Sequence, residues 1–245
     1  MTLPMKVALA FFGITRSLKY TIKSIKFNII DELEKNGIEH DVFLHSYIVS
    51  SYSNKRTGEK CDNMDNEEYK ILNPKYVQID NQDLIKEKLN LAEYRTHKDP
   101  WKTNYNSVDN FILGKFSLQC VTQLIKNTNE YYDYIIFLRP DVCYLNKITT
   151  FLETNNNGPT IIIPSFHLFG KYKFNDRFCI ATMNTYEIYG NVFEKLLDLS
   201  KKQELHSETI MGQIISNAAI TIKRVPFVFR RIRCNGKIEP KDKRL

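Results

Sequence analysis

The chain alternates between short apolar runs and longer stretches in which apolar residues recur every three or four positions. Each run has the length of a strand, and the first, "KVALAFFG", is apolar throughout, as strands buried on both faces are. The longer stretches have the spacing of helices with one buried face. The predicted strands are residues 6–13, 40–47, 75–80, 134–138, 160–165 and 174–182, with more in 220–233.

The predicted helices lie between these strands. The first carries its apolar face on Leu18, Ile22, Ile25, Ile29 and Leu33 and ends near Gly37. Asn81, Ser107 and Ser207 are of the residue types that cap a first turn, and each precedes a helical pattern. A further helix, with Gly190 inside it, is predicted at 184–202. Residues 50–73 are polar without a period, and we expect a long surface loop there.

Strands that alternate with helices predict an α/β fold. The pattern indicates a single Rossmann-like domain over residues 1–245, with a mostly parallel central sheet flanked by helices. The strands are closer together in the C-terminal half, so we expect some mixed strand directions there. Ligands of such sheets bind outside the carboxyl ends of the strands, which is where we look for a site.

Charge and cysteine content narrow the function. The net charge of +7 suits an anionic partner: nucleic acid, an anionic membrane or a phosphorylated ligand. Lys and Arg are scattered except for the dense cluster "FRRIRCNGKIEPKDKRL" at 229–245. The five cysteines are far apart and odd in number, which predicts no zinc module or disulfide framework and favours a reducing, cytoplasmic compartment. No apolar run approaches the roughly 20 residues of a membrane span.

Charged residues directly follow one predicted buried strand, where Arg139, Pro140 and Asp141 come after residues 134–138. Pro140 ends the ladder of strand hydrogen bonds, so the turn leaves the sheet there. Asp141 has the oxygen donors that Mg²⁺ or Mn²⁺ prefers beside a diphosphate. Arg139 has the planar fork that binds a phosphate or a carboxylate. The alternative is an Arg–Asp ion pair that only caps the strand.

The segment "YDYIIFLRPDV" resembles the R-x-D segment of a group of GT-A-fold glycosyltransferases from bacteria and giant viruses, similar to lipopolysaccharide-type sugar transferases. Other segments resemble that family in the same order, with weak coverage from about residue 50 to 104. They are "KVALAFFGITRS", "HDVFLHSY", "LGKFSLQCVTQLIKNTNEYYDY", "NDRFCIATMNTYEIYGNVF" and "HSETIMGQIIS". The resemblance implies a GT-A-like domain with a nucleotide-sugar-binding half at 1–145 and an acceptor-side half at 146–245.

The resemblance also implies roles for residues of the first half. Gly13 and Arg16 would lie near the nucleotide and its diphosphate, in the loop after the first strand. His45 would lie near the base or ribose, although a histidine in an apolar strand also suits a purely structural role. Asp141 would be the carboxylate for a metal or for the sugar-nucleotide. Arg139 stands where many GT-A enzymes have another carboxylate, so the need for Mn or Mg is left open.

In the second half, Asp176 and Arg177 would face the donor sugar or the acceptor. Glu208 is the candidate base that takes the acceptor's proton, unless it serves only the dipole of the helix that it begins. Arg231, with Arg230 and Arg233, would fold back over the diphosphate and stabilise the leaving group. Trp101, in the first half, is a candidate platform for a sugar or base, unless it serves only in packing.

The implied activity is transfer of a sugar from a nucleotide-diphosphate sugar to a hydroxyl acceptor on a glycan or glycoconjugate. The expected partners are that donor and acceptor, without nucleic acid, in the cytoplasm or, for a viral protein, the host cytoplasm. One alternative is a nucleotidyltransferase, which needs a second metal carboxylate near Asp141. Another is a polyanion-binding module, which needs a basic stripe with interleaved aromatic residues. The oligomeric state and the donor base are left open.

Overall fold

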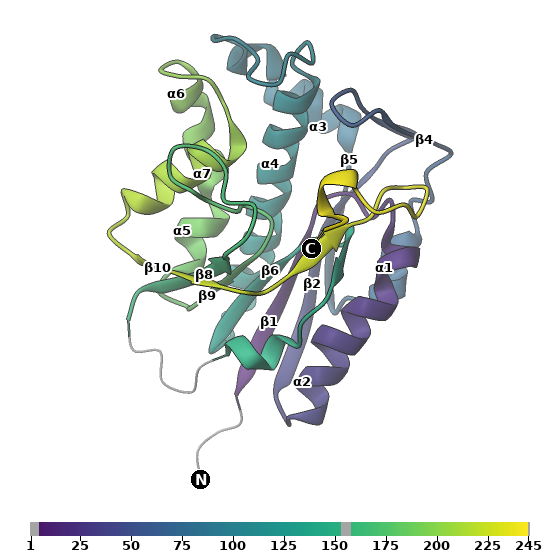
Figure 1. Ribbon diagram of the computed structural model, residues 1–245, viewed down its shortest axis with the longest axis vertical. Coiled ribbons are helices and arrows are strands. Elements are labelled where there is room, and N and C mark those ends of the chain that lie inside the picture. Colours follow the sequence, from purple (N-terminus) through teal and green to yellow (C-terminus); the bar gives the residue numbers. More distant parts are fainter. Residues whose placement is uncertain (1–4, 153–157, 245) are drawn as a thin grey trace.

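A seven-stranded sheet forms the centre of the molecule, in the order β10-β8-β9-β6-β1-β2-β5 (Figure 1). The computed structural model describes residues 5–152 and 158–244. All neighbouring pairs are parallel except that β9 runs antiparallel to both β6 and β8, which confirms the predicted mixture in the C-terminal half. The strands are β1 Lys6–Phe12, β2 Glu39–Ile48, β5 Tyr76–Asn81, β6 Tyr134–Leu138, β8 Thr160–Pro164, β9 Cys179–Ala181 and β10 Thr221–Val225.

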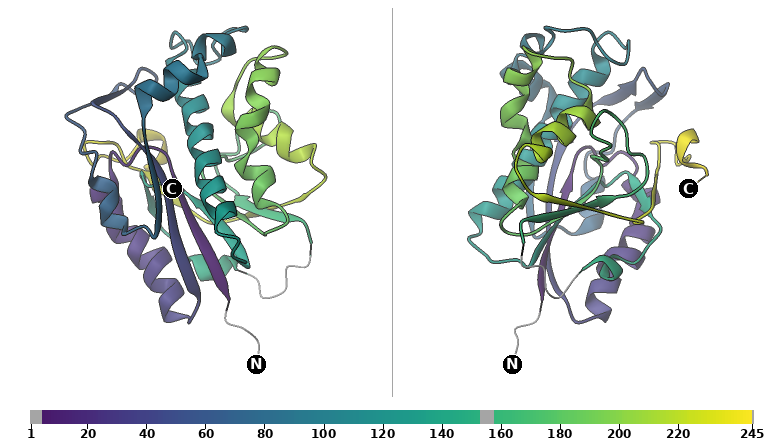
Figure 2. Two further views of the ribbon diagram at one scale, coloured as in Figure 1. Left: turned by 180° about the vertical axis from the view of Figure 1, so that it is seen from behind. Right: turned by 60° about the vertical axis from the view of Figure 1, so that its left-hand side comes forward.

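Helices cover both faces of this sheet, with α1 and α2 on one face and α4 to α7 on the other (Figure 2). The helices are α1 Leu18–Ile25, α2 Asp31–Lys35, α3 Gln82–Leu89, α4 Asn106–Asn127, α5 Tyr186–Gly190, α6 Leu196–Ser200 and α7 Ser207–Ser216. Short 3₁₀ turns are η2 Glu68–Leu72, η3 Leu91–Tyr94, η4 Ile148–Phe151, η5 Val192–Lys195 and η6 Pro240–Asp242. The predicted α/β fold class is therefore confirmed. No helix in the described ranges combines the length and apolar character needed to cross a bilayer.

The first strand shows why the sheet needs a helix layer on each face. Successive side chains of a strand point to opposite faces. Val7, Leu9 and Phe11 pack into the cluster under α1, whereas Ala8 and Ala10 belong to the cluster under α4. All five are buried, so β1 has no solvated face and reads as one apolar run.

Residues 50–73 do not form the predicted surface loop. They contain a hairpin of β3 Ser51–Asn54 and β4 Glu59–Asp62, followed by η2. The hairpin strands have only four residues each, and their buried member is Glu59, which pairs with arginines far away in the chain. These strands have no apolar period, because long-range ion pairs hold them in place. The sequence pattern therefore does not predict them. A second small pair joins β7 Val142–Tyr144 to β11 Phe229–Arg231.

The helix ends agree only partly with the sequence. Asn81 caps α3 as predicted, because its Oδ1 accepts hydrogen bonds from the N–H groups of Asp83 and Leu84. Ser107 and Ser207 are not caps: each lies inside its helix, and the N-cap positions of α4 and α7 belong to other residues, neither of which makes a side-chain cap bond. At the start of α4, the backbone N–H of Ser107 instead donates to Thr103 Oγ1 at 3.0 Å.

Two predicted long helices are interrupted. The first contains a π-helical turn, η1 Lys26–Ile30, between α1 and α2. The second ends at Gly190 and continues as η5 and α6, although the pattern predicts a helix through that glycine. A side chain at position 190 would collide with Thr122 of α4, so the absence of a Cβ lets α5 approach α4 closely.

We expect Gly190→Ala to lower the free energy of unfolding by about 1–3 kcal/mol, because overfilling a packed core costs that much. The new Cβ would overlap Thr122 Oγ1 and lie 2.6 Å from its Cγ2, and Thr122 is fully buried. Gly114→Ala is the control, since Gly114 lies within α4 and its added Cβ meets no atom within 4 Å. That variant is expected to gain up to about 1 kcal/mol from helix propensity. Urea denaturation of both variants would contradict the packing argument if Gly190→Ala were as stable as the wild type.

Candidate active site

The carboxyl ends of β1 and β6 lie side by side, because these strands are parallel neighbours with Phe11 opposite Leu138. The loop after β1 begins at Gly13, and the turn after β6 contains Arg139 and Asp141. Gly13 has a φ of +98°, a conformation that residues with a Cβ rarely adopt. The two loops therefore meet at the edge of the sheet where α/β proteins bind ligands.

Strand β9 adds residues to the same edge because it runs against β6. Phe137, near the end of β6, is opposite Cys179, the first residue of β9. The segment just before β9 therefore lies beside the carboxyl end of β6. Asp176 and Arg177, in this segment, line the same pocket as Arg139. This is a consequence of the single antiparallel strand in the sheet.

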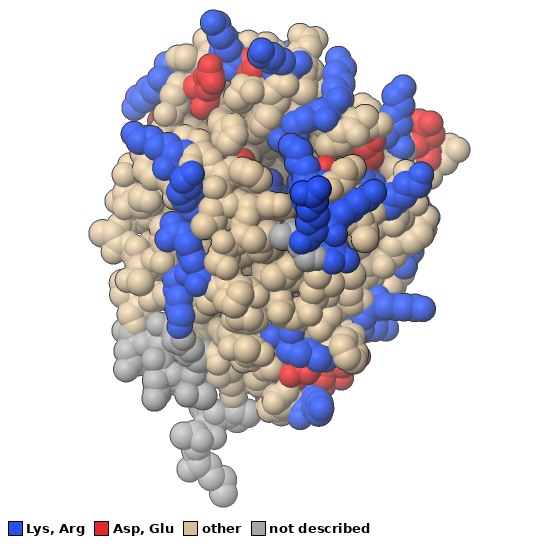
Figure 3. Space-filling view, in the orientation of Figure 1, with Lys and Arg blue, Asp and Glu red and all other residues tan. Residues whose placement is uncertain are grey.

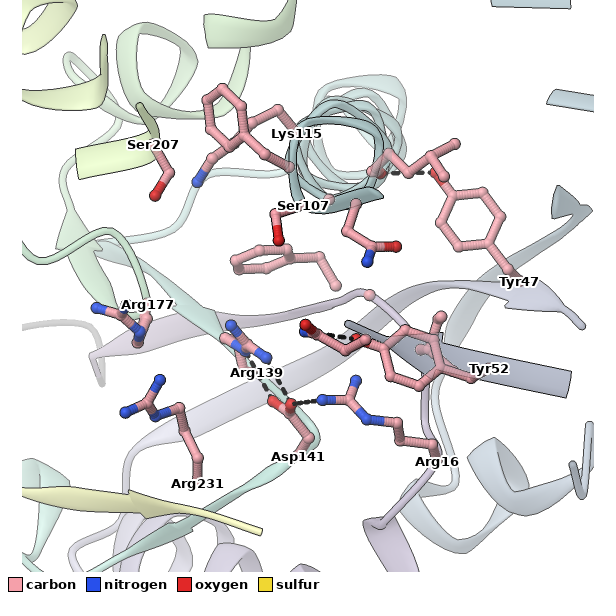
Figure 4. Close-up of a pocket in the computed structure, with 18 of the residues that line it drawn as sticks. Arg16, Tyr47, Tyr52, Ser107, Lys115, Arg139, Asp141, Arg177, Ser207 and Arg231 are labelled. Carbon is pink, nitrogen blue, oxygen red and sulfur yellow. Dashed lines mark hydrogen bonds and ion pairs between the residues drawn. The ribbon is translucent and has the colours of Figure 1, made fainter. Parts of the chain in front are cut away.

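These segments enclose a cavity of about 180 Å³, large compared with the ~15 Å³ that one water needs. Figure 4 shows Asp141 between Arg16 and Arg139, with α4 across the pocket. Most of the residues proposed from sequence line it: Gly13, Arg16, Arg139, Asp141, Asp176, Arg177 and Arg231. His45 and Glu208 do not.

Both oxygens of Asp141 accept hydrogen bonds from arginines. Arg139 Nε donates to Oδ1 at 2.7 Å and Arg139 Nη2 to Oδ2, while Arg16 Nη2 donates to Oδ2 at 2.8 Å. Only 1% of Asp141 is exposed. Burial alone would raise the pKa of its carboxyl, but the charges of Arg139 and Arg16 outweigh burial and hold the pKa well below its usual range. Asp141 is therefore an ionised carboxylate between two guanidinium groups.

Asp176 is paired with a lysine that the sequence did not single out. Lys115 extends from the middle of α4 and its Nζ lies 3.1 Å from Asp176 Oδ2. Burial would raise the pKa of Asp176, but the charge of Lys115, followed by that of Arg177, lowers it below the usual range. Asp176 is thus an ionised carboxylate that lines the pocket and can accept hydrogen bonds there.

Glu208 lies beside the pocket, 3% exposed, with its carboxylate already engaged. Arg177 Nη2 donates to Glu208 Oε1 at 2.7 Å, and Ser207 Oγ donates to Oε2 at 2.6 Å. Glu208 therefore holds the guanidinium of a residue that does line the pocket. Its role as catalytic base stays a prediction.

The hairpin β3–β4 and the C-terminal segment meet at Glu59, which is 8% exposed. Its Oε1 accepts from Arg16 Nε at 3.0 Å and from the Cys234 backbone N–H at 2.9 Å, and its Oε2 accepts from Arg233 Nη1 at 3.0 Å. Arg231 is held in turn by Asp242, with Nη2 donating to Oδ1 at 2.6 Å. The basic C-terminal cluster is therefore partly folded into the pocket wall, which Arg231 and Arg233 line.

Arg56, at the turn of the same hairpin, is another pocket residue that the sequence did not identify. Throughout the described ranges it makes no ion pair with a carboxylate, and its guanidinium carbon lies 5.5 Å from the ring centroid of Trp101. Trp101 stacks on His206 with 5.4 Å between ring centroids. Partial desolvation, and then the charge of Arg177, lower the pKa of Arg56, which indicates a positive potential at this part of the pocket.

Three buried polar atoms in pocket-lining residues have no hydrogen-bond partner in the described structure. They are Ser107 Oγ and Asn110 Nδ2 on α4, and Arg177 Nη1. Buried polar groups in folded proteins are nearly always paired, so unpaired ones demand an explanation. Their position around one cavity indicates that a polar ligand or ordered water completes their bonding. The sequence predicted Ser107 only as a helix cap, and Asn110 carried no signal.

His45 supports the pocket from behind. It is fully buried, and its Nδ1 lies 2.7 Å from Ser117 Oγ, which also accepts the backbone N–H of Gly13 at 2.8 Å. His45 Nε2 lies 3.1 Å from Asp80. Burial lowers the pKa of His45, against the influence of Asp80. His45 thus fixes the loop after β1, and the contact with a base or ribose that sequence suggested stays a prediction.

Comparisons with known proteins found similar structures, but no match by sequence to a protein family or a curated protein. The structure is similar to a glycosyltransferase involved in glycosylation of the major capsid of PBCV-1 (TM-score 0.47, 10% identity, 91% of this chain and 82% of that chain). It is similar to the galactosyltransferase LgtC in complex with donor and acceptor sugar analogues (0.45, 12%, 90% and 73%). It is also similar to a putative glucose-1-phosphate thymidylyltransferase from Bacillus anthracis (0.42, 8%, 93% and 89%).

Proposed function

We propose that this protein is a nucleotide-sugar-dependent glycosyltransferase that moves a sugar to a hydroxyl of a glycan or glycoconjugate. The observation that carries the proposal is the pocket at the carboxyl ends of β1 and β6. It combines guanidinium groups for a diphosphate, such as Arg16 and Arg139, with an ionised carboxylate, Asp176, for sugar hydroxyls. The resemblance of "YDYIIFLRPDV" to glycosyltransferases agrees with this arrangement.

Each half of the chain has a task in this proposal. Residues 1–145 would bind the nucleotide-sugar through Gly13, Arg16 and the turn that contains Arg139. Residues 146–245 would orient the donor sugar and the acceptor through Asp176 and Arg177. Positive groups fixed beside the diphosphate stabilise the charge that develops as the nucleoside diphosphate leaves.

The acceptor would enter past the mouth of the pocket, where Trp101 stacks on His206 and presents an aromatic surface. On the face in Figure 3, Lys and Arg side chains gather over the C-terminal segment and form a second group toward the β10 edge. Such a field attracts an anionic donor and raises its rate of association.

The five free cysteines suit a reducing compartment, and we propose a cytoplasmic location.

A nucleotidyltransferase is the alternative with a similar α/β core. That chemistry uses two metal ions held by carboxylates on the reacting phosphates. Here the carboxylates that line the pocket are Asp141 and Asp176, and both are bound to cationic side chains. This arrangement favours transfer of the sugar over transfer of a nucleotide.

The proposal is tested with UDP-, GDP-, dTDP- and CMP-sugars in a thermal-shift screen, followed by measurement of Kd for any sugar-nucleotide that stabilises the protein. We expect one nucleotide class to raise the Tm. Asn110→Ala is then expected to weaken binding about 3- to 10-fold, the worth of one net hydrogen bond. Because Asn110 Nδ2 has no partner in the described protein, that substitution leaves no protein group unpaired.

Asn127→Ala is the matched control, since Asn127 is an exposed residue of the same helix outside the pocket. It should leave both Tm and Kd unchanged. If no sugar-nucleotide alters the Tm while random oligonucleotides do, the polyanion-binding alternative replaces the transferase.

A further inference from the structure

A divalent cation in the pocket would need carboxylate oxygens that are free to bind it. Asp141 has none, because its two oxygens accept three hydrogen bonds from Arg139 and Arg16. Asp176 Oδ2 lies 3.1 Å from Lys115 Nζ, and its Oδ1 lies 3.7 Å from Arg177 Nη1, an ion-pair distance that is too long for a hydrogen bond. A metal ion at Asp141 would have to displace a buried arginine, and one at Asp176 would lie directly beside Lys115 and Arg177. The residues of this pocket therefore do not fit Mn²⁺ or Mg²⁺.

The metal-ligating side chains that do lie together are elsewhere. Among the described residues, the ligand atoms of His45, Asp80 and Cys120 lie within 4.8 Å of one another, and none of these residues lines the pocket. His45 and Asp80 are already joined at 3.1 Å, and His45 is held behind the pocket by Ser117, with 2.7 Å between Nδ1 and Oγ. This group supplies no cation to a ligand bound near Asp141.

The pocket is lined instead by cationic side chains. Most of these cations are oriented by a carboxylate: Asp141 orients Arg16 and Arg139. Glu208 orients Arg177 in the same way. Arg56 has no carboxylate partner among the described residues. The cations that line the pocket are Arg16, Arg56, Lys115, Arg139, Arg177, Arg231 and Arg233.

We propose that the arginines of this pocket bind the diphosphate of the donor directly, in place of a divalent cation. The inference rests on the proposed function, because it concerns how the same site holds the nucleotide-sugar. Asp141 is then a positioning residue, which holds the forks of Arg16 and Arg139 in place before the ligand arrives. Arg56, with no carboxylate partner, provides N–H groups for the phosphate oxygens. Guanidinium forks match phosphate oxygens in bidentate geometry, so they replace a metal's charge and its orientation of the ligand.

The test compares binding of UDP, GDP, dTDP, CDP and inorganic pyrophosphate to the full chain in EDTA and in excess Mn²⁺ or Mg²⁺, by calorimetry. We expect the nucleoside diphosphate that binds to have the same Kd within about twofold in EDTA and in metal. A gain of tenfold or more with metal would overturn the inference and leave the proposed function standing. Pyrophosphate binding in EDTA without any nucleotide binding would keep the arginine site and overturn the proposed function. Binding of none of the probes would overturn both.

Arg56→Gln identifies the groups that do the binding. We expect it to weaken diphosphate binding about tenfold or more in EDTA, since one charge-assisted hydrogen bond is lost. Arg56 has no carboxylate partner, so its removal strands no buried charge and the fold is retained. Lys55→Gln is the matched control, because Lys55 is the exposed neighbouring cation outside the pocket, and it should change Kd less than twofold. If the two substitutions weakened binding equally, the effect would come from the overall positive charge of the surface. That result would contradict direct binding by Arg56.

Discussion

Replacing Asp141 by asparagine is expected to lower the free energy of unfolding by about 3–5 kcal/mol, the usual cost of breaking a buried ion pair from one side. The substitution keeps the size of the side chain but removes the charge that compensates Arg16 and Arg139. The Arg16 side chain is 6% exposed, so its guanidinium cannot recover solvation in water. Urea denaturation with a shared m-value measures the loss.

Two comparisons separate this cause from simple loss of packing. The loss of stability in the double variant Arg139→Met, Asp141→Asn should be smaller than the sum of the two single losses. Arg139→Met removes one of the charges that Asp141→Asn leaves unpaired. Pyrophosphate should raise the stability of Asp141→Asn more than that of the wild type, because it supplies the missing negative charge. Asp62→Asn, at an exposed position of the hairpin, is the control and should lie within about 0.5 kcal/mol of the wild type. An Asp141→Asn protein as stable as that control would contradict the role given to the ion pair.

The same pair predicts a response to acid. The pKa of Asp141 is lower in the folded protein than in the unfolded chain, where it is about 3.9. The folded state therefore gains stability from this group above that pH, and the gain is lost progressively as the pH falls below it. Between pH 7 and pH 3, the wild type should lose more stability than Asp141→Asn does.

For the proposed glycosyltransferase activity, Asp176→Asn is expected to reduce turnover by about 100-fold, the usual cost of a misplaced reacting group. Asp176 is the ionised carboxylate that lines the pocket apart from Asp141, and its position is fixed by Lys115. Its lowered pKa makes it a weak base but keeps it able to accept a hydrogen bond from an attacking hydroxyl. The loss should be in kcat, with KM for the sugar-nucleotide changed much less.

Glu208→Gln discriminates between the two carboxylates. If Glu208 acts through Arg177, the variant should raise KM more than it lowers kcat, because Arg177 loses the negative charge of the group 2.7 Å away that orients it. A greater loss of kcat in Glu208→Gln than in Asp176→Asn would support Glu208 as the catalytic base. Asp198→Asn, exposed on α6 and outside the pocket, should leave both constants unchanged.

The strands that build the sheet were predictable because their signal is local. A run such as Lys6–Phe12 is buried on both faces, so every position is apolar and no tertiary information is needed. Arg139 and Asp141 were found for the same reason: a charge directly after such a run stands out in the sequence. Asp176 and Arg177 came from the family resemblance, and the antiparallel direction of β9 explains how they reach the pocket.

The residues that sequence reasoning missed have signals that exist only after folding. Lys115 lies on a helix among apolar residues, and its partner Asp176 is distant in the chain. Arg56 and Glu59 belong to a hairpin whose strands are too short and too polar to be recognised by period. Glu59 holds this hairpin in place through contacts to Arg16, 43 positions before it, and Arg233, 174 positions after it. A pattern within 20 residues contains no trace of such a contact.

The contacts of Glu59 also set the order in which the site can form during synthesis. Arg16 and the hairpin leave the ribosome early, whereas Arg233 follows Glu59 by 174 residues. At 5–20 residues per second this interval lasts roughly 9–35 s, during which Glu59 has only its partner from the N-terminal half. The pocket wall that Arg231 and Arg233 complete is missing throughout that time. A nascent chain can therefore fold its first βαβ unit well before it has a finished ligand site.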